Sequence, residues 1–466
     1  MATPERKESV MDKVISLAKR RGFIYQGSEV YGGLAGTWDY GPLGVALKNN
    51  IKGLWWKRFV LNREDMYGMD AAILMNQNVW KASGHVGGFA DPLVEDLKTK
   101  KRYRADHLLE DIGVDVKGLR LADMDRLIKE KGVKSPDGNP LGDVRQFNMM
   151  FKTHCGAIED DTSVSYLRPE TAQGMFVNFK NILDSFHPRL PFGMAQIGKA
   201  FRNEIAPRDF TFRSREFEQM EIEYFVDPRD EKKVQETFDV LYEEQLNFLA
   251  DLGLEKAKIH KVEVPDADRA FYSKRSVDTE FDFPFGQKEL LGIAYRTDYD
   301  LNAHITASKV DLSYFDEETK TRFVPHCIEP TFGLDRLILA TLSSAYTEDS
   351  LGGEVRAFLK FSPKVAPIKV AVFPLLKNKP PLVEKARGIY QTLRNELGGS
   401  VVFDDNGNVG KRYRRQDEIG TPYCVTVDFE TVEKDNCVTV RDRDTGNQER
   451  VAVADLVRFL KEKVSL

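Results

Sequence analysis

The chain has 466 residues, of which 41% are hydrophobic and 30% charged, a balance typical of a folded globular protein rather than a disordered or fibrous one. This length predicts two to four domains, and no apolar run approaches the roughly 20 residues of a membrane-spanning helix, so we expect no membrane partner. The net charge of −5 excludes a polycation, and four separated cysteines without a CxxC pair argue against a disulfide framework and favour a cytoplasmic location.

The N-terminal part of the chain is irregular apart from one helix. Apolar residues within 10–17 recur at helical spacing, and the charge around them excludes the apolar core of a signal peptide. Glycine-rich stretches at 31–36 and 39–44 predict loops between short elements. The stretch 95–139 is charged and is broken by glycine and proline, so we interpret it as an insertion rather than a core element.

Residues 193–200 nearly match the phosphate-binding loop GxxxxGK[ST]. Ala200 stands where a hydroxyl would hold magnesium, however, and the interior of the loop is apolar rather than glycine-rich. We therefore favour a strand over 194–201. After a loop, residues 212–225 resume as the second strand of a hairpin and carry charges of both signs. The apolar spacing over 231–252 then predicts a long amphipathic helix.

The charges of this hairpin have two interpretations. A solvated face with cross-strand ion pairs is the simpler one. Charges that face inward, by contrast, are costly without ligands or partners. Arg202 and Glu204 are two residues apart and therefore share one face of the strand. An arginine can bridge phosphate oxygens in bidentate fashion, and a nearby carboxylate can accept a hydrogen bond from an exocyclic amine.

The clearest domain boundary lies at 362–367, where prolines punctuate a change of pattern. Beyond it, strands alternate with helices, which predicts a small α/β domain. The predicted strands are 368–373, 401–403, 423–427 and 437–440, with helices over 386–397 and near 456–460. We therefore expect two domains, a first at 1–362, with insertions at about 95–160 and 230–285, and a second at 366–466.

Two motifs of this chain resemble those of the class II aminoacyl-tRNA synthetases. Phe201-Arg202-x-Glu204, followed by a loop and an arginine, resembles motif 2, and Gly333-Leu-Asp-Arg336 at the start of an apolar helix resembles motif 3. The helix expected over 43–60 lies where the dimer-forming motif 1 would be. The resemblance implies an α+β fold, with a catalytic antiparallel sheet flanked by helices and a C-terminal α/β anticodon-binding domain.

A closer resemblance, from about Met11 to the C-terminus, is to the glycyl-tRNA synthetases of the single-chain homodimeric type. The segments that carry it are Ser28-Glu-Val-Tyr-Gly-Gly-Leu, Thr37-Trp-Asp-Tyr-Gly-Pro-Leu-Gly, Leu167-Arg-Pro-Glu-Thr-Ala-Gln-Gly, Arg215-Glu-Phe-Glu-Gln-Met-Glu, Gly292-Ile-Ala-Tyr-Arg-Thr-Asp-Tyr-Asp-Leu and Gly410-Lys-Arg-Tyr-Arg-Arg-Gln-Asp-Glu-Ile-Gly-Thr-Pro. The resemblance implies ATP-dependent activation of glycine to glycyl-adenylate, transfer of glycine to the 3′ end of tRNA(Gly), and a homodimer. Positioning and neutralisation of phosphate charge would carry this chemistry without a nucleophilic side chain.

The resemblance also implies a role for residues of an ATP site. Arg202 would hold the α-phosphate, and Arg213 and Arg336 would lie near the outer phosphates. Glu204 would accept from the adenine amino group, and Phe217 would stack on the adenine ring. The expected ATP-binding set is Arg202, Asn203, Glu204, Phe212, Arg213, Phe217, Glu289, Leu290, Gly333 and Arg336. Of these, Arg202 and Arg336 are the expected catalytic residues.

Magnesium is the metal that the resemblance implies. Mg²⁺ would be held largely by the ATP phosphates, with Glu289 as its protein contact. Many members of the family carry zinc-binding cysteines just before an Arg-Tyr-Arg-Ala-Asp segment. Residues 95–106 of this chain contain that segment but no cysteine, so we expect no zinc site.

Glycine has no side chain to grip, so its site must bind the ammonium and the carboxylate and exclude every larger side chain. The resemblance implies an acidic pocket for the ammonium, with Thr331 near the α-carbon at a position where serine is typical of the family. Clustered carboxylates suit an ammonium ligand and otherwise repel one another. The expected glycine-binding set is Arg104, Glu170, Phe217, Glu218, Glu221, Arg296, Glu329, Thr331 and Gly333. Pairing of Glu221 with Arg213 or Arg215, and a surface role for Arg104, are the alternatives.

The expected anticodon domain contains a basic segment with an aromatic residue inside it. Lys411, Arg412, Arg414 and Arg415 would neutralise tRNA phosphates, and Tyr413 would offer a ring for stacking on a base. The alternative is a solvated helix end that pairs with the acidic residues after it. Two rival functions remain at this point, a synthetase for histidine, proline or threonine, and a catalytically inactive relative that only binds nucleic acid.

Overall fold

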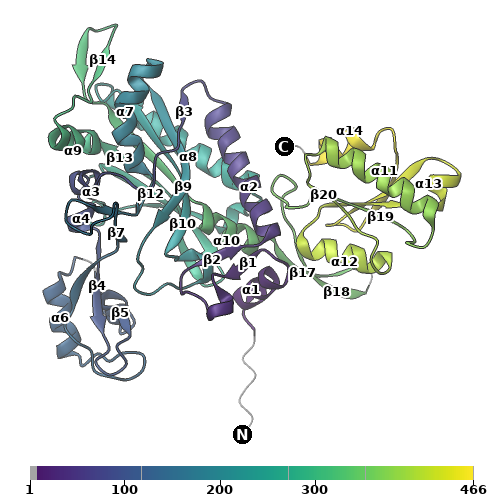
Figure 1. Cartoon of the computed structure of the whole chain (residues 1–466), viewed down its shortest axis with the longest axis horizontal. Helices are drawn as coiled ribbons and strands as arrows, with labels where there is room; N and C mark the ends of the chain where they lie inside the picture. Colours follow the sequence, from purple (N-terminus) through teal and green to yellow (C-terminus); the bar gives the residue numbers. More distant parts are fainter. Residues whose placement is uncertain (1–7, 117, 271, 352, 465–466) are drawn as a thin grey trace.

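A seven-stranded sheet lies at the centre of the larger part of the molecule in the computed structural model, which describes residues 8–116, 118–270, 272–351 and 353–464 (Figure 1). The strand order is β11-β12-β13-β16-β10-β9-β3, and every pair is antiparallel except β3 with β9. The strands are β3 (Met66–Gly68), β9 (Phe192–Phe201), β10 (Glu216–Val226), β11 (Ile259–Glu263), β12 (Arg275–Phe283), β13 (Gly286–Thr297) and β16 (His326–Gly333). The predicted α+β class is confirmed, and 194–201 is a strand rather than a phosphate-binding loop.

Alternation along β10 determines which helices cover which face of this sheet. Met220 and Ile222 pack in a core with α1, α2, α8 and α10, whereas Phe225 packs with α7 and α9 in a second core. Because Glu221 and Glu223 share the odd-numbered side with Phe225, they lie on the α7–α9 face. The helices are α1 (Val10–Arg20), α2 (Pro42–Trp56), α7 (Ala172–Phe186), α8 (Glu231–Asp251), α9 (Tyr299–Ser308) and α10 (Leu334–Ala345).

Local sequence sets the ends of these helices. Ser9 and Asp12 form a capping box at α1, in which each side chain accepts from the other's main-chain N–H at 3.1 Å. Pro42 occupies the first turn of α2, where its missing N–H has no intrahelical partner to lose. A π-helical turn over Lys57–Leu61 continues α2. It places the ring centre of Phe59 5.1 Å from that of Phe332 on the sheet.

A small three-stranded sheet, β5-β4-β6, forms a separate body with α5 and α6 at the lower left of Figure 1. Its own core contains Val94, Leu109 and Ile128 and is distinct from the core under the central sheet. Its elements are β4 (Ala90–Glu95), β5 (Arg102–Arg104), α5 (Ala105–Glu110), α6 (Leu121–Glu130) and β6 (Arg145–Asn148). The stretch interpreted as an insertion lies within this body.

Short elements connect the central sheet to its surroundings. They are β1 (Ile24–Gln26), β2 (Trp38–Tyr40), α3 (Gln77–Ala82), α4 (His85–Gly88), β7 (Lys152–His154), β8 (Val164–Tyr166), β14 (Tyr314–Asp316), β15 (Thr321–Phe323), β17 (Tyr346–Leu351) and β18 (Glu354–Leu359), with 3-10 turns at Glu29–Tyr31, Phe210–Phe212 and Lys256–Lys258. No helix in the described ranges has the length and apolar character needed to cross a membrane.

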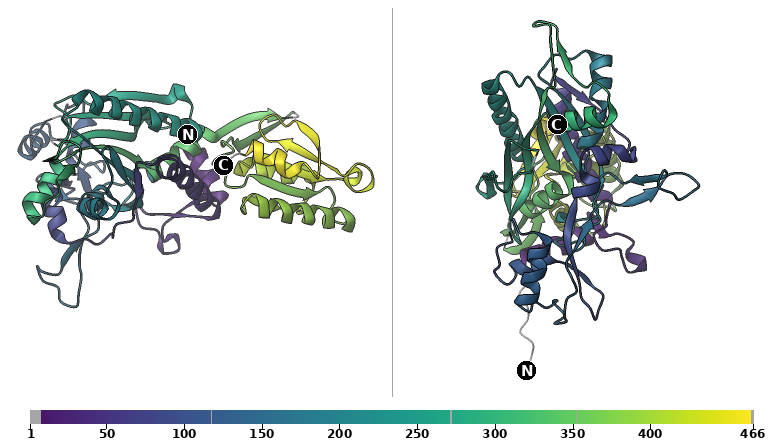
Figure 2. Two further views of the ribbon diagram at one scale, coloured as in Figure 1. Left: turned by 90° about the horizontal axis from the view of Figure 1, so that it is seen from above. Right: turned by 90° about the vertical axis from the view of Figure 1, so that its left-hand side faces the viewer.

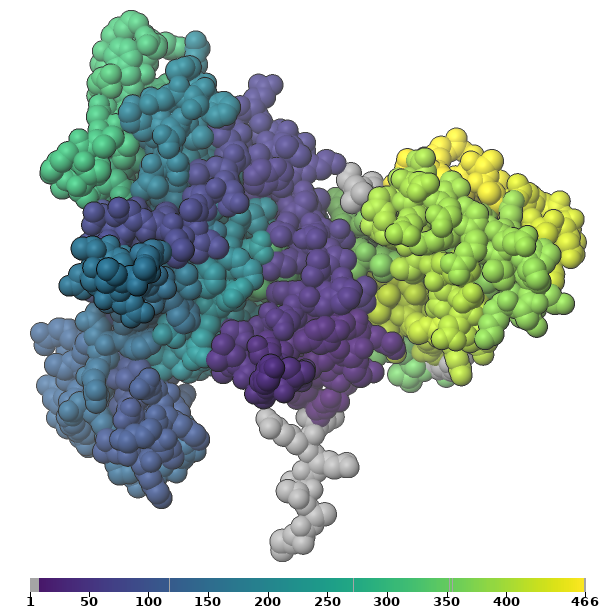
Figure 3. Space-filling view, viewed as in Figure 1, coloured from purple at the N-terminus to yellow at the C-terminus, as the bar shows by residue number. Residues whose placement is uncertain are grey.

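The C-terminal part is a second lobe (Figure 3). It contains a five-stranded sheet of order β20-β19-β21-β22-β23, in which the first three strands are parallel. Its elements are β19 (Val370–Pro374), α11 (Pro380–Glu396), β20 (Val401–Phe403), α12 (Val409–Ile419), β21 (Tyr423–Val427), α13 (Phe429–Glu433), β22 (Cys437–Asp442), β23 (Gln448–Ala452) and α14 (Leu456–Lys463). The sequence prediction includes all of these except α12, α13 and β23. Figure 2 shows this lobe beside the larger one, with its own layer of helices.

Candidate active site

A cavity of about 180 Å³ lies where β9, β10, β13 and β16 meet the first turn of α10. Along β10 it is lined by Phe217, Glu218 and Gln219. All the residues expected at the ATP site line this cavity except Asn203. Asn203 donates its main-chain N–H to the Met149 carbonyl at 2.7 Å, next to the cavity.

Arg202 lies directly after β9, at the mouth of the cavity. Its Nε donates to the Pro169 carbonyl at 3.1 Å, and its guanidinium lies 5.2 Å from the centre of the Phe217 ring and 5.3 Å from that of Phe89. Within the described part of the chain, its other two nitrogens have no hydrogen-bond partner. A guanidinium that is held at one nitrogen and backed by rings is suited to a bidentate contact with phosphate.

Glu204 presents an acceptor at the same end of the cavity. Glu204 is 8% exposed. The nearest cation is Arg213, whose Nη1 lies 3.7 Å from Oε2 of Glu204. That distance is too long for a hydrogen bond, and Oε2 is buried with no hydrogen-bond donor among the described residues. A buried carboxylate oxygen without a donor is costly, so the site fits a ligand that brings an N–H group, such as an adenine amine.

Arg336 and Glu289 form the opposite rim. Arg336 Nη1 donates to the main-chain carbonyl of Glu289 at 3.0 Å and lies 3.1 Å from its carboxylate, and the guanidinium stacks 4.3 Å from the Phe212 ring. Burial, together with the charge of Glu289, raises the pKa of neighbouring Asp278 to about 6. The described residues contain no group of three or more metal-ligating side chains. Mg²⁺ in nucleotide sites is generally held by one or two carboxylates together with substrate phosphates.

The expected acidic pocket is assembled from three chain segments. Glu221 on β10 lies opposite Thr331 on β16, and Glu329 is two residues before Thr331 on the same strand. Glu170 comes from the turn before α7. The Thr331 hydroxyl donates to Glu221 at 3.4 Å, and the main-chain N–H of Thr171 donates to the other oxygen of Glu221 at 3.1 Å. The structure therefore brings these three carboxylates to one place beside the cavity that Arg202 lines.

Arg296 is the buried cation of this pocket. It is 3% exposed, donates to Asp300 at 2.7 and 2.9 Å, and donates to both oxygens of Glu329 at 2.8 and 3.0 Å. Because Asp300 and Glu329 share its single charge, the carboxylates of Glu170 and Glu221 are left in excess. A pocket with such an excess of negative charge is suited to a small cation.

The pKa values of the three glutamates also reflect the excess negative charge in this pocket. Burial acts to raise the pKa of Glu170, but the nearby His85 and Arg296, with a hydrogen bond from Gln173, hold it well below its ordinary value. Burial raises the pKa of Glu221, and the charge of Glu170 raises it further. Burial raises the pKa of Glu329 to about 8 against the opposing effect of Arg296. An incoming ammonium would lower the two raised values by neutralising the repulsion.

Gln173 links the carboxylates and was not predicted from the sequence. Its amide nitrogen donates to Glu170 at 3.1 Å and to Asp300 at 2.9 Å, and its amide oxygen lies 2.8 Å from Nε2 of His304. Two carboxylates fix the orientation of the amide, so His304 must donate its Nε2 proton. The signal for Gln173 was its position in Glu170-Thr-Ala-Gln173, one helical turn after Glu170.

Two residues expected to bind glycine, Glu218 and Arg104, have side chains that are engaged by other groups in the structure. Glu218 points to the opposite face of β10, where Lys48 Nζ lies 2.7 Å and Lys52 Nζ 3.2 Å from its carboxylate. Strand alternation causes this, because Glu218 cannot share a face with Glu221. Arg104 lies on β5 in the small separate body.

The surroundings of Arg104 are those of the adenine end rather than the acidic pocket. Its guanidinium is held by Asp91 and Asp106, and the carboxylate of Glu204 contributes to its raised pKa. Neither Glu221 nor Glu329 is among its partners. Arg104 therefore joins the small body to the Glu204 side of the cavity and is already neutralised there.

The basic segment of the C-terminal lobe is helix α12, and the structure divides its residues. Lys411 is exposed, Arg414 is half-buried with one nitrogen on the Val355 carbonyl at 3.1 Å, and Arg415 pairs with Asp404 at 2.7 Å. These three side chains lie at or near the surface of the lobe.

Arg412 and Tyr413 are corrections. Arg412 is 1% exposed and donates to the main-chain carbonyls of Pro374, Asp405, Asn406 and Gly407, so its charge is used inside the fold. The Tyr413 hydroxyl hydrogen-bonds Thr426 at 2.7 Å, and its ring packs against Phe373. An inward ring cannot stack on an anticodon base.

The antiparallel sheet, with Arg202 directly after β9 and Arg336 in the first turn of α10, has the architecture of a class II aminoacyl-tRNA synthetase. Residues 151–345 match the family model of the tRNA synthetase class II core domain (G, H, P, S and T), and residues 369–463 match that of the anticodon binding domain. A prolyl-tRNA synthetase from Cryptosporidium parvum, solved with halofuginone and AMPPNP, has the same fold, with a TM-score of 0.65 over 97% of this chain and 75% of its own, at 14% identity.

Relatives that align over nearly the whole chain show which kind of class II synthetase it resembles. A glycine–tRNA ligase of Clostridium acetobutylicum is 50% identical over 98% of this chain and 100% of its own length. That of Lachnospira eligens is 50% identical over 98% and 99%, and that of Bacillus anthracis is 49% identical over 97% and 99%. The chain belongs to the glycine–tRNA ligase family.

Proposed function

We propose that this chain uses ATP to convert glycine to glycyl-adenylate and then transfers the glycine to the 3′ end of tRNA(Gly). The observation that carries the proposal is an acidic pocket with excess negative charge directly beside a cavity lined with arginines. The pocket suits an ammonium, and the arginines suit a polyphosphate. An amino acid bound next to ATP would place its ammonium in the acidic pocket and the ATP phosphates against the arginines.

In the proposed first step, a carboxylate oxygen of glycine attacks the α-phosphate in line, and pyrophosphate leaves. Arg202 neutralises charge at the α-phosphate, while Arg213 and Arg336 receive the outer phosphates. Glu204 accepts from the adenine amino group, and Phe217 stacks on the ring. Glu170, Glu221 and Glu329 bind the glycine ammonium. The chain thus contributes position and charge rather than a nucleophile.

The cofactor in this proposal is Mg²⁺ bound with ATP. Glu289 would contact it, and the adjacent Asp278 supplies a second carboxylate. The metal would add charge neutralisation at the phosphates. The expectation of no zinc site stays a prediction, and metal analysis of the purified protein tests it.

Two further parts of the proposal concern assembly and location. We place the domain boundary at 362–366 and propose a homodimer formed through the motif 1 region at 43–60, together with the nearby edge strand β3. An edge strand has unpaired main-chain groups that a second copy can engage. Light scattering on the purified chain measures its mass, and a monomer would refute the dimer. Cell fractionation tests the cytoplasmic location.

The decisive experiment is ATP–pyrophosphate exchange with each of the twenty amino acids before any tRNA is added. We expect exchange with glycine alone, because the clustered carboxylates suit an ammonium and a glycine site must exclude every larger side chain. Exchange with another amino acid would retain the class and refute the glycine pocket. Folded protein that binds RNA but shows no exchange would favour the catalytically inactive alternative.

A further inference from the structure

The hairpin β17–β18 bridges the two lobes of the molecule (Figure 1). Its base belongs to the larger lobe, since β17 follows α10 directly and Lys360 donates its main-chain N–H to the Ala345 carbonyl at the end of that helix at 2.6 Å. Leu359 and Phe361 are buried in the core under the central sheet. The hairpin therefore extends from the same helix whose first turn places Arg336 in the cavity.

Arg356 on β18 carries a charge from this hairpin into the C-terminal lobe. Its side chain is 2% exposed, and Nη1 donates to Asp417 on α12 at 2.8 Å and to the Arg443 carbonyl at 2.9 Å. Asp349, directly across the hairpin, binds the other side of the guanidinium at 2.6 and 2.9 Å. Arg356 thus ties one lobe to the other through a buried charge.

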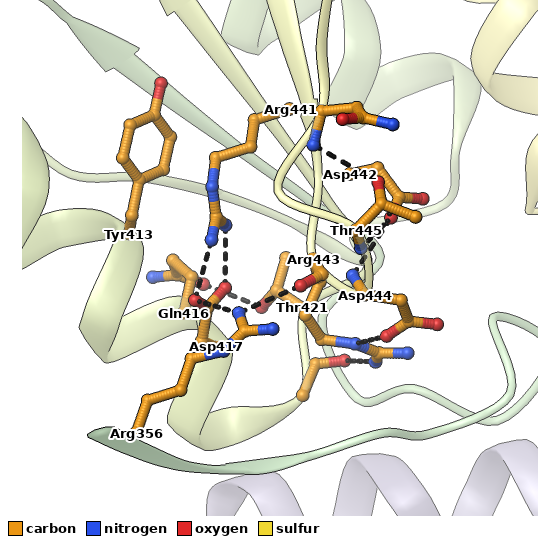
Figure 4. Close-up of polar contacts among 12 residues, drawn as sticks. Arg356, Tyr413, Gln416, Asp417, Thr421, Arg441, Asp442, Arg443, Asp444 and Thr445 are labelled. Atoms are coloured by element: carbon orange, nitrogen blue, oxygen red, sulfur yellow. Dashed lines mark hydrogen bonds and ion pairs between the residues drawn. The ribbon is translucent and has the colours of Figure 1, made fainter. Parts of the chain in front are cut away.

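Asp417 is neutralised from both lobes. Arg441 on β22 donates to both of its oxygens at 2.8 and 2.9 Å from within the C-terminal lobe, and Arg356 reaches it from the hairpin (Figure 4). The Asp417 side chain is 2% exposed. A buried aspartate with two arginines has a fixed geometry, because each guanidinium offers planar donors that fit few orientations.

The contact surface around this cluster is close-packed. Gly420 ends α12 with a φ of +84°, and a Cβ there would lie 2.9 Å from the Leu359 carbonyl and closer still to the Phe361 ring. Arg443 is 2% exposed and donates to the Gly420 carbonyl at 2.7 Å and to the Phe361 carbonyl at 2.8 Å. The hairpin and α12 are therefore held in one relative orientation.

We propose that Arg356 is a positioning residue for tRNA charging, which holds the C-terminal lobe at the orientation that delivers the tRNA 3′ end to the catalytic cavity. This inference rests on the proposed function. Helix α12 carries both Asp417 and the surface cations Lys411 and Arg415, so the orientation of the tRNA-binding surface is set through the same helix. Arg356 lies outside the cavity and takes no part in glycine activation.

The test compares glycine-dependent pyrophosphate exchange with tRNA charging in Arg356→Leu. Arg441 still neutralises Asp417 in this variant, so the C-terminal lobe keeps its internal pair. We expect exchange like that of the unmodified chain and a fall of at least about tenfold in kcat/KM for tRNA, since misplacement by about 1 Å can cost about 100-fold in rate. Dyes on exposed Cys155 and half-buried Cys437 should report a broader distance distribution between the lobes.

Three further variants keep the test sharp. Arg458→Leu removes an exposed arginine whose partner Asp455 is in its own turn, and it should change nothing. Asp349→Asn removes the hairpin partner but keeps the Asp417 contact, and it should leave charging near normal. Arg356→Lys keeps the charge without the fork, and it should reduce charging while it leaves exchange intact, which provides the test if the leucine variant does not fold.

Each of three results would overturn the role of Arg356. These are an equal loss of exchange and charging, unchanged charging in Arg356→Leu, and a loss in Asp349→Asn as large as that in Arg356→Leu, which would assign the effect to the hairpin alone. An unmodified chain without glycine-dependent exchange would instead refute the proposed function. The interlobe distance would then still decide whether Arg356 fixes the orientation.

Discussion

At the scale of single residues, the exclusion of alanine depends on the space beside the α-carbon of the substrate. Thr331 donates to Glu221 and carries a methyl group that serine lacks. We predict that Thr331→Ser raises alanine-dependent pyrophosphate exchange relative to glycine by about tenfold, because a methyl-sized difference in a pocket is worth roughly 10- to 200-fold in discrimination. Thr237→Ser, at a half-buried position on α8, is the matched control. An unchanged alanine rate would show that other groups close the pocket.

The proposed role of Glu329 implies a pH dependence of glycine binding. Its pKa of about 8 means that it is mostly protonated below pH 8, and an ammonium ligand favours the ionised form. Binding must therefore release the proton, so glycine affinity should rise by up to about tenfold per pH unit and level off near pH 8. The KM for glycine in exchange assays between pH 6 and 8.5 measures this. Glu329→Gln should remove this pH dependence of the KM, whereas Glu216→Gln, at the first position of β10, should not. The same pH dependence in Glu329→Gln as in the unmodified chain would contradict the assignment of Glu329.

The sequence allows a prediction of which residues belong to the candidate site, but not of the contacts that those residues make. Glu221, Glu329 and Arg296 come from three strands, and the sequence motifs named all three before their contacts were known. The motif resemblance placed Glu218 and Glu221 in one binding set. Alternation along the strand, however, puts their side chains on opposite faces of the sheet. Gln173 could not be assigned, because its role depends on Asp300 from a distant helix.

At the scale of elements, Glu218 joins β10 to α2 through ion pairs with Lys48 and Lys52. Burial acts to raise its pKa, but Lys48 and Lys52 outweigh burial, so the pKa is lowered on folding. We predict that Glu218→Gln lowers the free energy of unfolding by about 2 kcal/mol at pH 7 and leaves the KM for glycine unchanged. Urea unfolding measures the first and exchange kinetics the second. A raised KM with unchanged stability would return Glu218 to the pocket.

The sign of this effect with pH follows from the lowered pKa. The ion pair stabilises the fold above the unfolded-state pKa of about 4.3, and that contribution is lost as the pH falls through the folded-state value. The difference between the unmodified chain and Glu218→Gln should therefore shrink on acidification. A constant difference down to low pH would mean that packing rather than charge is responsible.

The elements that the sequence predicted share strong patterns, and the missed ones do not. Strand β19 is a continuous apolar run, and α10 is apolar on nearly every side, so burial leaves them no alternative. Strand β23 reads Gln-Glu-Arg-Val-Ala and takes its strand form from pairing with β22. Helix α12 has four cations in five residues, and only its tertiary contacts show that Arg412 is internal.

At the scale of the whole molecule, the two chemical steps of the proposed reaction use different lobes. Activation needs the central sheet, whereas transfer also needs tRNA held by the C-terminal lobe. The family matches follow this division, with the synthetase core at 151–345 and the anticodon-binding domain at 369–463. Mutations on the surface of the second lobe should therefore separate charging from activation.

The surface of α12 offers the clearest case of such separation. We predict that replacing Lys411 and Arg415 together by glutamine weakens tRNA charging and flattens its dependence on salt, because each lost phosphate contact removes roughly 0.7 to 0.9 from the logarithmic salt slope. Glycine-dependent exchange should be unchanged. Arg412→Gln on the same helix should instead lower the unfolding midpoint, since four main-chain carbonyls would lose their donor. Lys434→Gln, an exposed lysine elsewhere in the lobe, is the control. If the double variant lost exchange and charging equally, α12 would have a structural role rather than a tRNA-binding one.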